Sequence, residues 1–198
     1  PDETNYLLAR EPGKGIIAVP PHLGNWERFG HWLQASGRTI TVVARDADRS
    51  GPKVTERINE IRRMNGMGVV SRGDSAREIL RLLRKDQLGR LLPDQTSEEA
   101  FIPHFGYPAG TVLGPAVLSI RTGAPILPCS CLRVGPARYE VVLEPPLFAR
   151  EGETPEELTA RMNLSIEKLV RRAPEQYLWI HDRWKSARLK GLLPPEAT

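Results

Sequence analysis

Apolar residues along the chain fall into short runs, and the segments between the runs have helical spacing. Four runs in the first half of the chain predict buried strands, at 15–20, 39–44, 69–70 and 90–93. After each of the first three runs, apolar residues recur every three or four positions, which predicts an amphipathic helix. These helices begin near Trp26, Pro52 and Ser75. The pattern therefore predicts repeated strand–helix units.

The second half of the chain continues with the same two kinds of segment. Residues 94–111 have no clear periodicity and are expected to form a long loop. A helix is predicted at 115–123, followed by strands at 126–132 and 139–143 that are joined by a turn. Thr154-Pro155-Glu156-Glu157 is a capping box with proline at the first helical position, so a final long helix is expected to begin there.

Strand–helix units with apolar strands favour one α/β domain that covers residues 1–198. We expect a mostly parallel central sheet flanked by helices on both faces, with the characteristic segments between about 15 and 185. Ligands of such sheets bind at the carboxyl ends of the strands. His22, Arg45 and Asp94 each follow a predicted strand, so we expect them to meet in one cleft.

Composition agrees with a globular domain. Of the 198 residues, 40% are hydrophobic and 26% are charged, which excludes disordered and fibrous classes. Cys129 and Cys131 are expected on one face of a strand as small buried residues in a reducing compartment. No apolar stretch approaches the roughly 20 residues that a membrane-spanning helix needs. The chain begins at Pro1 rather than Met, which leaves open whether a preceding segment, such as a membrane anchor, belongs to the protein.

The net charge of +4 is compatible with several acidic partners. Anionic lipid headgroups, an acidic carrier protein and nucleic acid all fit a mildly basic surface. Aromatic residues do not interleave with a compact basic motif, so a nucleic-acid partner is not expected. The segment from Trp179 to Lys190 mixes tryptophan with cationic residues. It is interpreted either as a contact with a membrane surface or as a segment packed on the sheet.

The run from His22 to Glu27 contains the strongest candidate chemistry. His22 lies in a predicted strand-to-helix turn, and Glu27 lies in the first turn of the following helix. From there its carboxylate can orient one imidazole nitrogen, which leaves the other to accept a proton from a substrate hydroxyl. No Gly-x-Ser-x-Gly motif is present, so direct attack by the activated acceptor is favoured over an acyl-enzyme. The alternative for His22 is a structural role, because most histidines do no chemistry.

Four segments of the chain, in this order, carry a resemblance to a known family. They are His22-Leu-Gly-Asn-Trp-Glu27, Leu92-Pro93-Asp94-Gln95, the block Pro103–Pro125 with Gly114-Pro115-Ala116 inside it, and Gln176-Tyr177-Leu178-Trp179 with its continuation to Lys185. Together they resemble the motifs of the lysophospholipid acyltransferase superfamily. The closest likeness is to the lipid A late acyltransferases and the phosphatidylinositol mannoside acyltransferases.

The resemblance implies transfer of a fatty acyl group from an acyl thioester, on acyl carrier protein or coenzyme A, to a hydroxyl of a membrane glycolipid or lysolipid. His22 would be the general base, Glu27 would orient it, and Asp94 would be a second acid near the imidazole. Substrate-binding roles are expected for Arg45 and Arg63, as partners of a phosphate or of the oxyanion, and for residues of the block that could line an acyl groove. The groove residues are Phe105, Gly106 and Thr111.

Two other reactions stay open at this point. One is formation of a glycerophospholipid from a lysophospholipid, and the other is hydrolysis of the thioester by a water molecule that His22 activates. No cofactor is expected, and no cluster of His, Cys and carboxylate residues has the spacing of metal ligands. The resemblance implies a peripheral protein on an anionic membrane surface, at the cytoplasmic face of a bacterial inner membrane.

Overall fold

A six-stranded sheet forms the centre of the fold. The structure, a computed structural model, describes residues 3–44, 52–71, 73 and 75–194. Its sheet has the strand order β3-β2-β4-β1-β7-β8. The strands are β1 (Ile16–Val19), β2 (Ile40–Ala44), β3 (Gly68–Ser71), β4 (Leu88–Arg90), β7 (Ile126–Gly135) and β8 (Arg138–Leu143).

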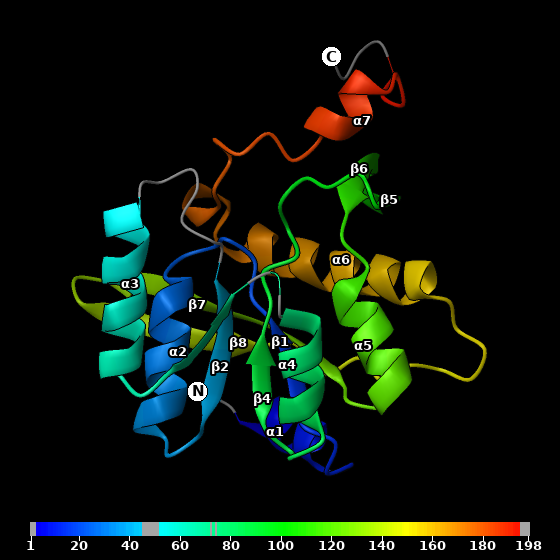
Figure 1. The fold of residues 1–198 in the computed structure, drawn as a ribbon. Helices are drawn as coiled ribbons and strands as arrows, with labels where there is room; N and C mark the ends of the chain where they lie inside the picture. The colour runs from blue at the N-terminus through cyan, green and yellow to red at the C-terminus, as the bar shows by residue number, and fades with distance from the viewer. Residues whose placement is uncertain (1–2, 45–51, 72, 74, 195–198) are drawn as a thin grey trace.

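Parallel pairing dominates this sheet. Strand β1 lies at its centre, where Ile17 pairs with Gly89 of β4 on one side and with Ile126 of β7 on the other. Both pairings are parallel, as are those of β2 with β3 and β4, and only β8 is antiparallel to its neighbour. The predicted mostly parallel sheet is therefore confirmed (Figure 1).

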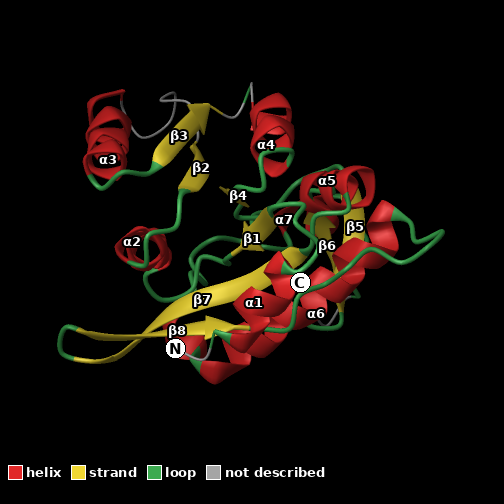
Figure 2. Cartoon of the chain, turned by 90° about the horizontal axis from the view of Figure 1, so that it is seen from below, coloured by secondary structure: helices red, strands yellow, loops and turns green. Residues whose placement is uncertain are grey.

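Helices cover both faces of the sheet, as the apolar strands require. Figure 2 shows α2 and α3 on one side of the strands and α4 and α5 on the other. The helices are α1 (Thr4–Arg10), α2 (Trp26–Ala35), α3 (Pro52–Met64), α4 (Ser75–Leu83), α5 (Gly114–Thr122), α6 (Pro155–Arg172) and α7 (Lys185–Leu189), with a 3₁₀ turn at Pro174–Gln176. In the described part of the chain, no helix is both long and apolar enough to cross a membrane.

Alternation along β1 divides the interior into two cores. Ile17 and Val19 pack with residues of α4, α5 and α6, whereas Ile16 and Ala18 pack with residues of α1 and α2. Cys129 and Cys131 are buried free thiols in the second core, as predicted. Helix α6 begins at the predicted capping box, in which the Thr154 hydroxyl accepts a hydrogen bond from the Glu157 N–H at 3.2 Å.

The segment 94–111 differs from the prediction. Instead of an unstructured loop it contains an antiparallel hairpin, β5 (Ala100–His104) and β6 (Tyr107–Thr111). Pro103 and Pro108 face each other in its register. Proline within a run counts against a strand in sequence reasoning, because it lacks the N–H that a ladder needs. An isolated two-stranded ladder has free edges, so it accommodates both prolines.

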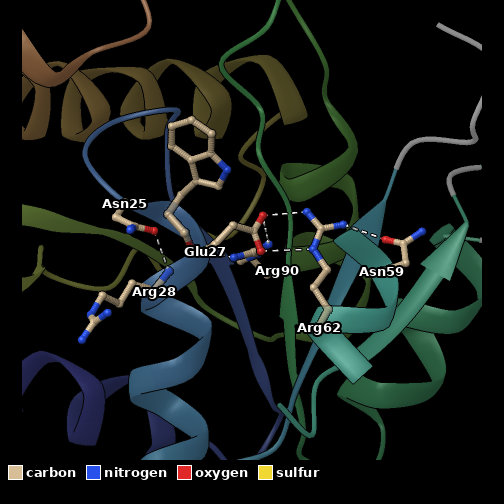
Figure 3. Close-up of polar contacts among 7 residues, drawn as sticks. Asn25, Glu27, Arg28, Asn59, Arg62 and Arg90 are labelled. Atoms are coloured by element: carbon tan, nitrogen blue, oxygen red, sulfur yellow. Dashed lines mark hydrogen bonds and ion pairs between the residues drawn. The ribbon is translucent and has the colours of Figure 1, made fainter. Parts of the chain in front are cut away.

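A charged cluster links α2, α3 and β4 at one side of the sheet (Figure 3). The Glu27 carboxylate accepts two hydrogen bonds from Arg62, at 2.6 Å from Nη2 and 3.1 Å from Nε. It also accepts one from Nη2 of Arg90 at 3.2 Å. Arg90 is 1% exposed, and its Nη1 donates to the Trp26 carbonyl at 2.6 Å. Asn59 completes the cluster by accepting from Arg62 at 2.9 Å.

Ionisation of Glu27 holds this cluster together. Burial opposes the charged form of the carboxyl, but the hydrogen bonds and positive charges of Arg62 and Arg90 outweigh burial, so the pKa of Glu27 lies below its ordinary value. Burial lowers the pKa of the Arg90 guanidinium, and the charge of Glu27 opposes that effect. A buried guanidinium without a counter-charge is costly. Glu27 is therefore needed to keep Arg90 in the interior.

We predict that Glu27→Gln destabilises the fold by roughly 1–3 kcal/mol at neutral pH, because Arg90 loses its counter-charge while Glu27 is partly exposed to screening solvent. A carboxyl whose pKa is lower in the folded than in the unfolded state stabilises the fold at pH values above its unfolded-state pKa. This stabilisation is lost as the pH falls through its folded-state pKa. The difference from the unaltered protein should therefore shrink below about pH 4.5. Urea unfolding of both proteins, measured from neutral pH to below about pH 4.5, tests this prediction.

The matched control is Glu56→Gln. Glu56 pairs with Arg63 at 2.8 Å, but both side chains are more than half exposed. Exposed pairs contribute about 0–1 kcal/mol, so this substitution should change stability little. Equal destabilisation by the two substitutions, or a loss for Glu27→Gln that does not depend on pH, would contradict the assigned role.

Candidate active site

The turn after β1 places His22 at the carboxyl end of the sheet. Gly24 in this turn has φ +62°, and its N–H donates to the Gln176 carbonyl at 3.1 Å. A Cβ atom at this position would lie 2.4 Å from the Cys131 carbonyl oxygen, so only glycine fits. Asn25 then caps α2 by accepting a hydrogen bond from the Arg28 N–H at 3.0 Å. The path of the chain is thus defined on both sides of the histidine.

Asp94 is the partner of His22. One carboxylate oxygen, Oδ1, lies 2.8 Å from Nδ1 of the imidazole, and the other, Oδ2, accepts from the His22 backbone N–H at 2.7 Å. The two residues follow β1 and β4, which are adjacent parallel strands. The expectation that residues at the strand ends meet is confirmed for this pair.

The charge of Asp94 determines the tautomer of His22. The Asp94 side chain is 3% exposed, and burial opposes its ionisation. Hydrogen bonds from the imidazole and from the His22 backbone N–H outweigh burial, so the pKa of Asp94 lies below its ordinary value. An ionised carboxylate only accepts hydrogen bonds, so Nδ1 must carry the proton. Nε2 is then left with a lone pair that can accept a proton.

His22 lines a cleft with a volume of about 590 Å³. One part of the wall is apolar and comes from α3, α4 and α5, with Ile58, Leu80 and Leu118 among its residues. Glu27 and Arg62 from the charged cluster line another part. The cleft therefore places a proton acceptor beside a long apolar surface, which suits a substrate with an apolar chain and a polar reacting group.

Glu27 does not have the partner that the sequence predicted. Its carboxylate binds Arg62 and Arg90, whereas the imidazole of His22 binds Asp94. The expectation that Glu27 orients the imidazole is corrected accordingly. The physical reason is that two guanidinium groups attract the carboxylate more strongly than a neutral imidazole does. Trp26, between them in sequence, contacts the His22 ring edge-on with 5.0 Å between ring centroids.

The two arginines that were expected to bind substrate, Arg45 and Arg63, are not found in the cleft lining of the described structure. Arg45 lies outside the described residues. Arg63 points away from the cleft lining and pairs with Glu56 at the surface. Its neighbour Arg62 lines the cleft instead, because successive residues of α3 point in different directions.

The predicted groove block is divided between two places. Phe105 and Gly106 form the turn of the β5–β6 hairpin, and Thr111 is buried, so none of the three is among the cleft-lining residues. The residues directly after them do line the cleft: Val112, Gly114, Pro115, Val117 and Leu118. The block contributes to the cleft through its helical half.

Several residues of the site have no role in the sequence-based prediction. Arg62 and Arg90 were not singled out, although an arginine in an apolar strand segment such as the one around Arg90 is a usable signal, since it needs a buried counter-charge. Tyr177 lies in a segment that carries the resemblance, but nothing in the sequence indicates that it forms a bridge with Leu23 in the histidine turn. In the described parts of the chain, no group of three or more His, Cys, Asp or Glu side chains is placed to hold a metal ion.

Comparison with known proteins gives a consistent result. A profile of the bacterial lipid A biosynthesis acyltransferases matches residues 3–186. A lipid A biosynthesis palmitoleoyltransferase of Escherichia coli is 34% identical over 92% of this chain and 60% of its own length. A lipid A biosynthesis acyltransferase of Haemophilus influenzae is 29% identical over 87% of this chain and 54% of its own length. A phosphatidylinositol mannoside acyltransferase of Mycobacterium tuberculosis is 32% identical over 60% of this chain and 39% of its own length.

The chain spans between about half and two thirds of the length of these two lipid A relatives. Within that span, the matching region includes His22, Asp94 and the segment after α6. The chain belongs to the family of bacterial lipid A biosynthesis acyltransferases.

Proposed function

We propose that the site transfers a fatty acyl group from an acyl thioester to a hydroxyl group of a membrane glycolipid. The observation that carries this proposal is the His22–Asp94 pair, joined at 2.8 Å, beside an apolar cleft. The names of the relatives support a glycolipid acceptor, because lipid A and phosphatidylinositol mannosides both carry sugar hydroxyls. Acyl carrier protein and coenzyme A both supply thioesters, so either serves as donor in this scheme.

His22 acts as general base in the proposed reaction. Its Nε2 removes the proton of the acceptor hydroxyl as the oxygen attacks the thioester carbonyl. Asp94, held by Nδ1–H, keeps the ring in place and balances the imidazolium charge as it forms. The tetrahedral intermediate collapses with breakage of the carbon–sulfur bond, and the imidazolium returns its proton to the thiolate. The products are the acyl ester and the free thiol, and the enzyme is unchanged.

The apolar part of the cleft is proposed to hold the acyl chain. Pockets for small ligands have volumes of about 300–1,000 Å³ and are lined mainly by apolar side chains. The cleft fits this description, and its apolar wall includes Ile79 and Val117. Acyl-groove roles for Phe105, Gly106 and Thr111 stay predictions. The residues that line the cleft are the ones that follow them, from Val112 to Leu118.

Phosphate groups are a feature of the proposed donors, and a basic side chain is proposed to bind one. Arg45 and Arg63 stay predictions for this role. Arg62 and Arg121 are the arginines at the cleft wall that, unlike Arg90, are not fully buried. They are better placed than Arg63, which is paired at the surface.

We predict that His22→Ala slows the chemical step by roughly 10²–10⁴-fold, the usual effect of a positioned general base. Binding of the thioester should change little, because the apolar chain supplies most of its contacts. The measurement is single-turnover acyl transfer to a glycolipid on protein shown to be folded. His31→Ala, in α2 but outside the cleft lining, is the matched control. A near-normal rate in folded His22→Ala would remove the proposed base.

The same assay separates the competing reactions. Loss of thioester that does not depend on any lipid acceptor would identify a thioesterase, in which water takes the place of the hydroxyl. Transfer to a lysophospholipid in preference to a glycolipid would identify a glycerophospholipid-forming enzyme. The proposal requires transfer that depends on the glycolipid.

A peripheral position at the cytoplasmic face of a bacterial inner membrane is proposed for the protein. Figure 1 shows α7 and the β5–β6 hairpin beyond the edge of the sheet at which β1, β2 and β4 end. His22 follows β1 at this edge. In the segment from Trp179 to the end of α7, the exposed fractions are 50% for Trp179, 93% for Ile180 and 75% for Leu189. Apolar side chains beside cations such as Lys190 suit the interface of an anionic bilayer. Arg183, by contrast, is buried, so only part of the predicted aromatic and cationic segment faces solvent.

We predict that the protein binds vesicles containing anionic lipid and that binding weakens as salt is added. Exposed charges are screened over ~8 Å at physiological ionic strength. Ile180→Ser should weaken binding further, since it removes the most exposed apolar side chain of this segment. Leu164→Ser, at a 59% exposed position on α6, is the control. Vesicle sedimentation measures both effects, and equal binding to neutral and anionic vesicles at all salt concentrations would refute the electrostatic part.

A further inference from the structure

The turn that carries His22 lies between two segments from the second half of the chain. On one side, Gly24 forms a parallel bridge with Cys131 of β7, and the Asn25 N–H donates to the Cys131 carbonyl at 2.8 Å. The approach is close, because the backbone of β7 fills the space that a side chain at Gly24 would need. The turn is therefore tied to the sheet through β7.

Residues 176–178, which follow α6, hold the other side of the turn. The Gly24 N–H donates to the Gln176 carbonyl at 3.1 Å, and the Leu178 N–H donates to the His22 carbonyl at 3.0 Å. The second of these bonds ends on the histidine itself. A segment more than a hundred positions later in the chain therefore defines where the carbonyl of His22 lies.

The side chain of Gln176 joins the two flanking segments to each other. Its Oε1 accepts a hydrogen bond from the Arg133 N–H at 2.9 Å, and its Nε2 donates to the Arg133 carbonyl at 3.0 Å. Strand β7 continues beyond Pro128, its last residue paired with β1, so this edge of β7 is open at Arg133. The amide of Gln176 thus binds β7 in the way that a neighbouring strand would.

Both backbone groups of His22 have a partner as a result. The N–H donates to Asp94 Oδ2 at 2.7 Å, and the carbonyl accepts from Leu178. Asp94 also binds Nδ1 of the ring, so it holds the side that faces β4. The side that faces Leu178 depends on residues 176–178, and the side chain that ties these residues to β7 is that of Gln176.

We propose that Gln176 is a positioning residue for His22: its side-chain amide fixes residues 176–178 to β7, and these residues fix the histidine turn. Gln176 is not among the residues that line the cleft, and it acts through the backbone. A general base must hold its nitrogen within hydrogen-bond reach of the proton that it removes, so a loosened turn slows the reaction. The inference rests on the proposed function only for this effect on the rate, since the hydrogen bonds exist in the free protein.

Hydrogen exchange of single backbone amides, measured by NMR on the full chain, tests the inference without a substrate. Gln176→Met keeps the length of the side chain but loses both hydrogen bonds to Arg133. A neutral hydrogen bond contributes a factor of about two to ten, so the Gly24 and Leu178 amides should exchange about fivefold faster or more. The Ile17 amide, which donates to a carbonyl in the centre of the sheet, reports on opening of the whole fold and should change less.

The matched control is Gln34→Met. Gln34 is also half-buried, and its Nε2 also donates to a backbone carbonyl, that of Gly66, but it lies near the end of α2. This substitution should leave the exchange of the two turn amides, those of residues 24 and 178, unchanged. The proposal is overturned if these two amides keep their exchange rates in Gln176→Met, or if they accelerate no more than the Ile17 amide does.

Gln176→Glu keeps the test decisive if Gln176→Met does not fold. A protonated carboxyl offers one donor and one acceptor, as the amide does, whereas a carboxylate only accepts. The introduced carboxyl has an ordinary pKa of about 4.3, and Glu175, whose Oε1 lies 3.4 Å from Gln176 Nε2, disfavours its charged form. Exchange of the Gly24 amide should be faster than in the unaltered protein at neutral pH and should approach it as the pH falls to about 4. A ratio of the two rates that does not depend on pH overturns the proposal.

Single-turnover acyl transfer gives the corresponding result for the reaction. Gln176→Met should lower the rate constant by roughly tenfold and leave the thioester concentration for half-maximal rate unchanged. In the His22→Ala background the same substitution should cause no further loss, because the base that it positions is gone. A structural role predicts the same proportional loss in both backgrounds, and that outcome would overturn the positioning role. Absence of acyl transfer by the unaltered protein would refute the proposed function, while amide exchange would still decide the role of Gln176.

Discussion

The contact between His22 Nδ1 and Asp94 Oδ1 is the interaction on which the rest of the site depends. It requires β1 and β4 to be adjacent and parallel, so that residues more than seventy positions apart emerge at one edge of the sheet. It also requires the tight turn at Gly24, where a larger residue would collide with the Cys131 carbonyl. The fold provides both conditions, and with them a histidine whose second nitrogen is a proton acceptor beside an apolar cleft.

Two acids near one histidine have separate tasks because their surroundings differ. Asp94 is deeply buried and accepts hydrogen bonds from His22, so its charge stabilises an imidazolium. Glu27 is held by Arg62 and Arg90, and its charge maintains the packing of α2, α3 and β4. Each buried charge needs a partner of opposite charge, and this need explains the division. Each buried guanidinium or imidazole pairs with the carboxylate that the backbone brings closest to it. The acid that is nearer in sequence is therefore not the acid that orients the base.

The sequence predicted the elements whose signals are local. The apolar runs of β1 and β2, the capping box at Thr154 and the turn containing His22 all depend on neighbouring residues, and all are confirmed. Pairings that depend on tertiary contacts were not predicted. The partner of Glu27 is determined by Arg62 on another helix, and the hairpin around Pro103 and Pro108 is stabilised by its pairing and by packing on α6. The approach of Tyr177 to the site likewise results from the path of the chain after α6.

A double-mutant cycle on His22 and Asp94 tests the central claim most directly. Asp94→Asn would offer an amide N–H to Nδ1 and favour the wrong tautomer, so its cost and that of His22→Ala arise from the same base. Single-turnover acyl transfer in the two single variants and in His22→Ala/Asp94→Asn should show strong coupling, with the double variant about as slow as His22→Ala alone. Additive losses for this pair, together with strong coupling between His22 and Glu27→Gln instead, would contradict the assignment of Asp94 as the partner of the base.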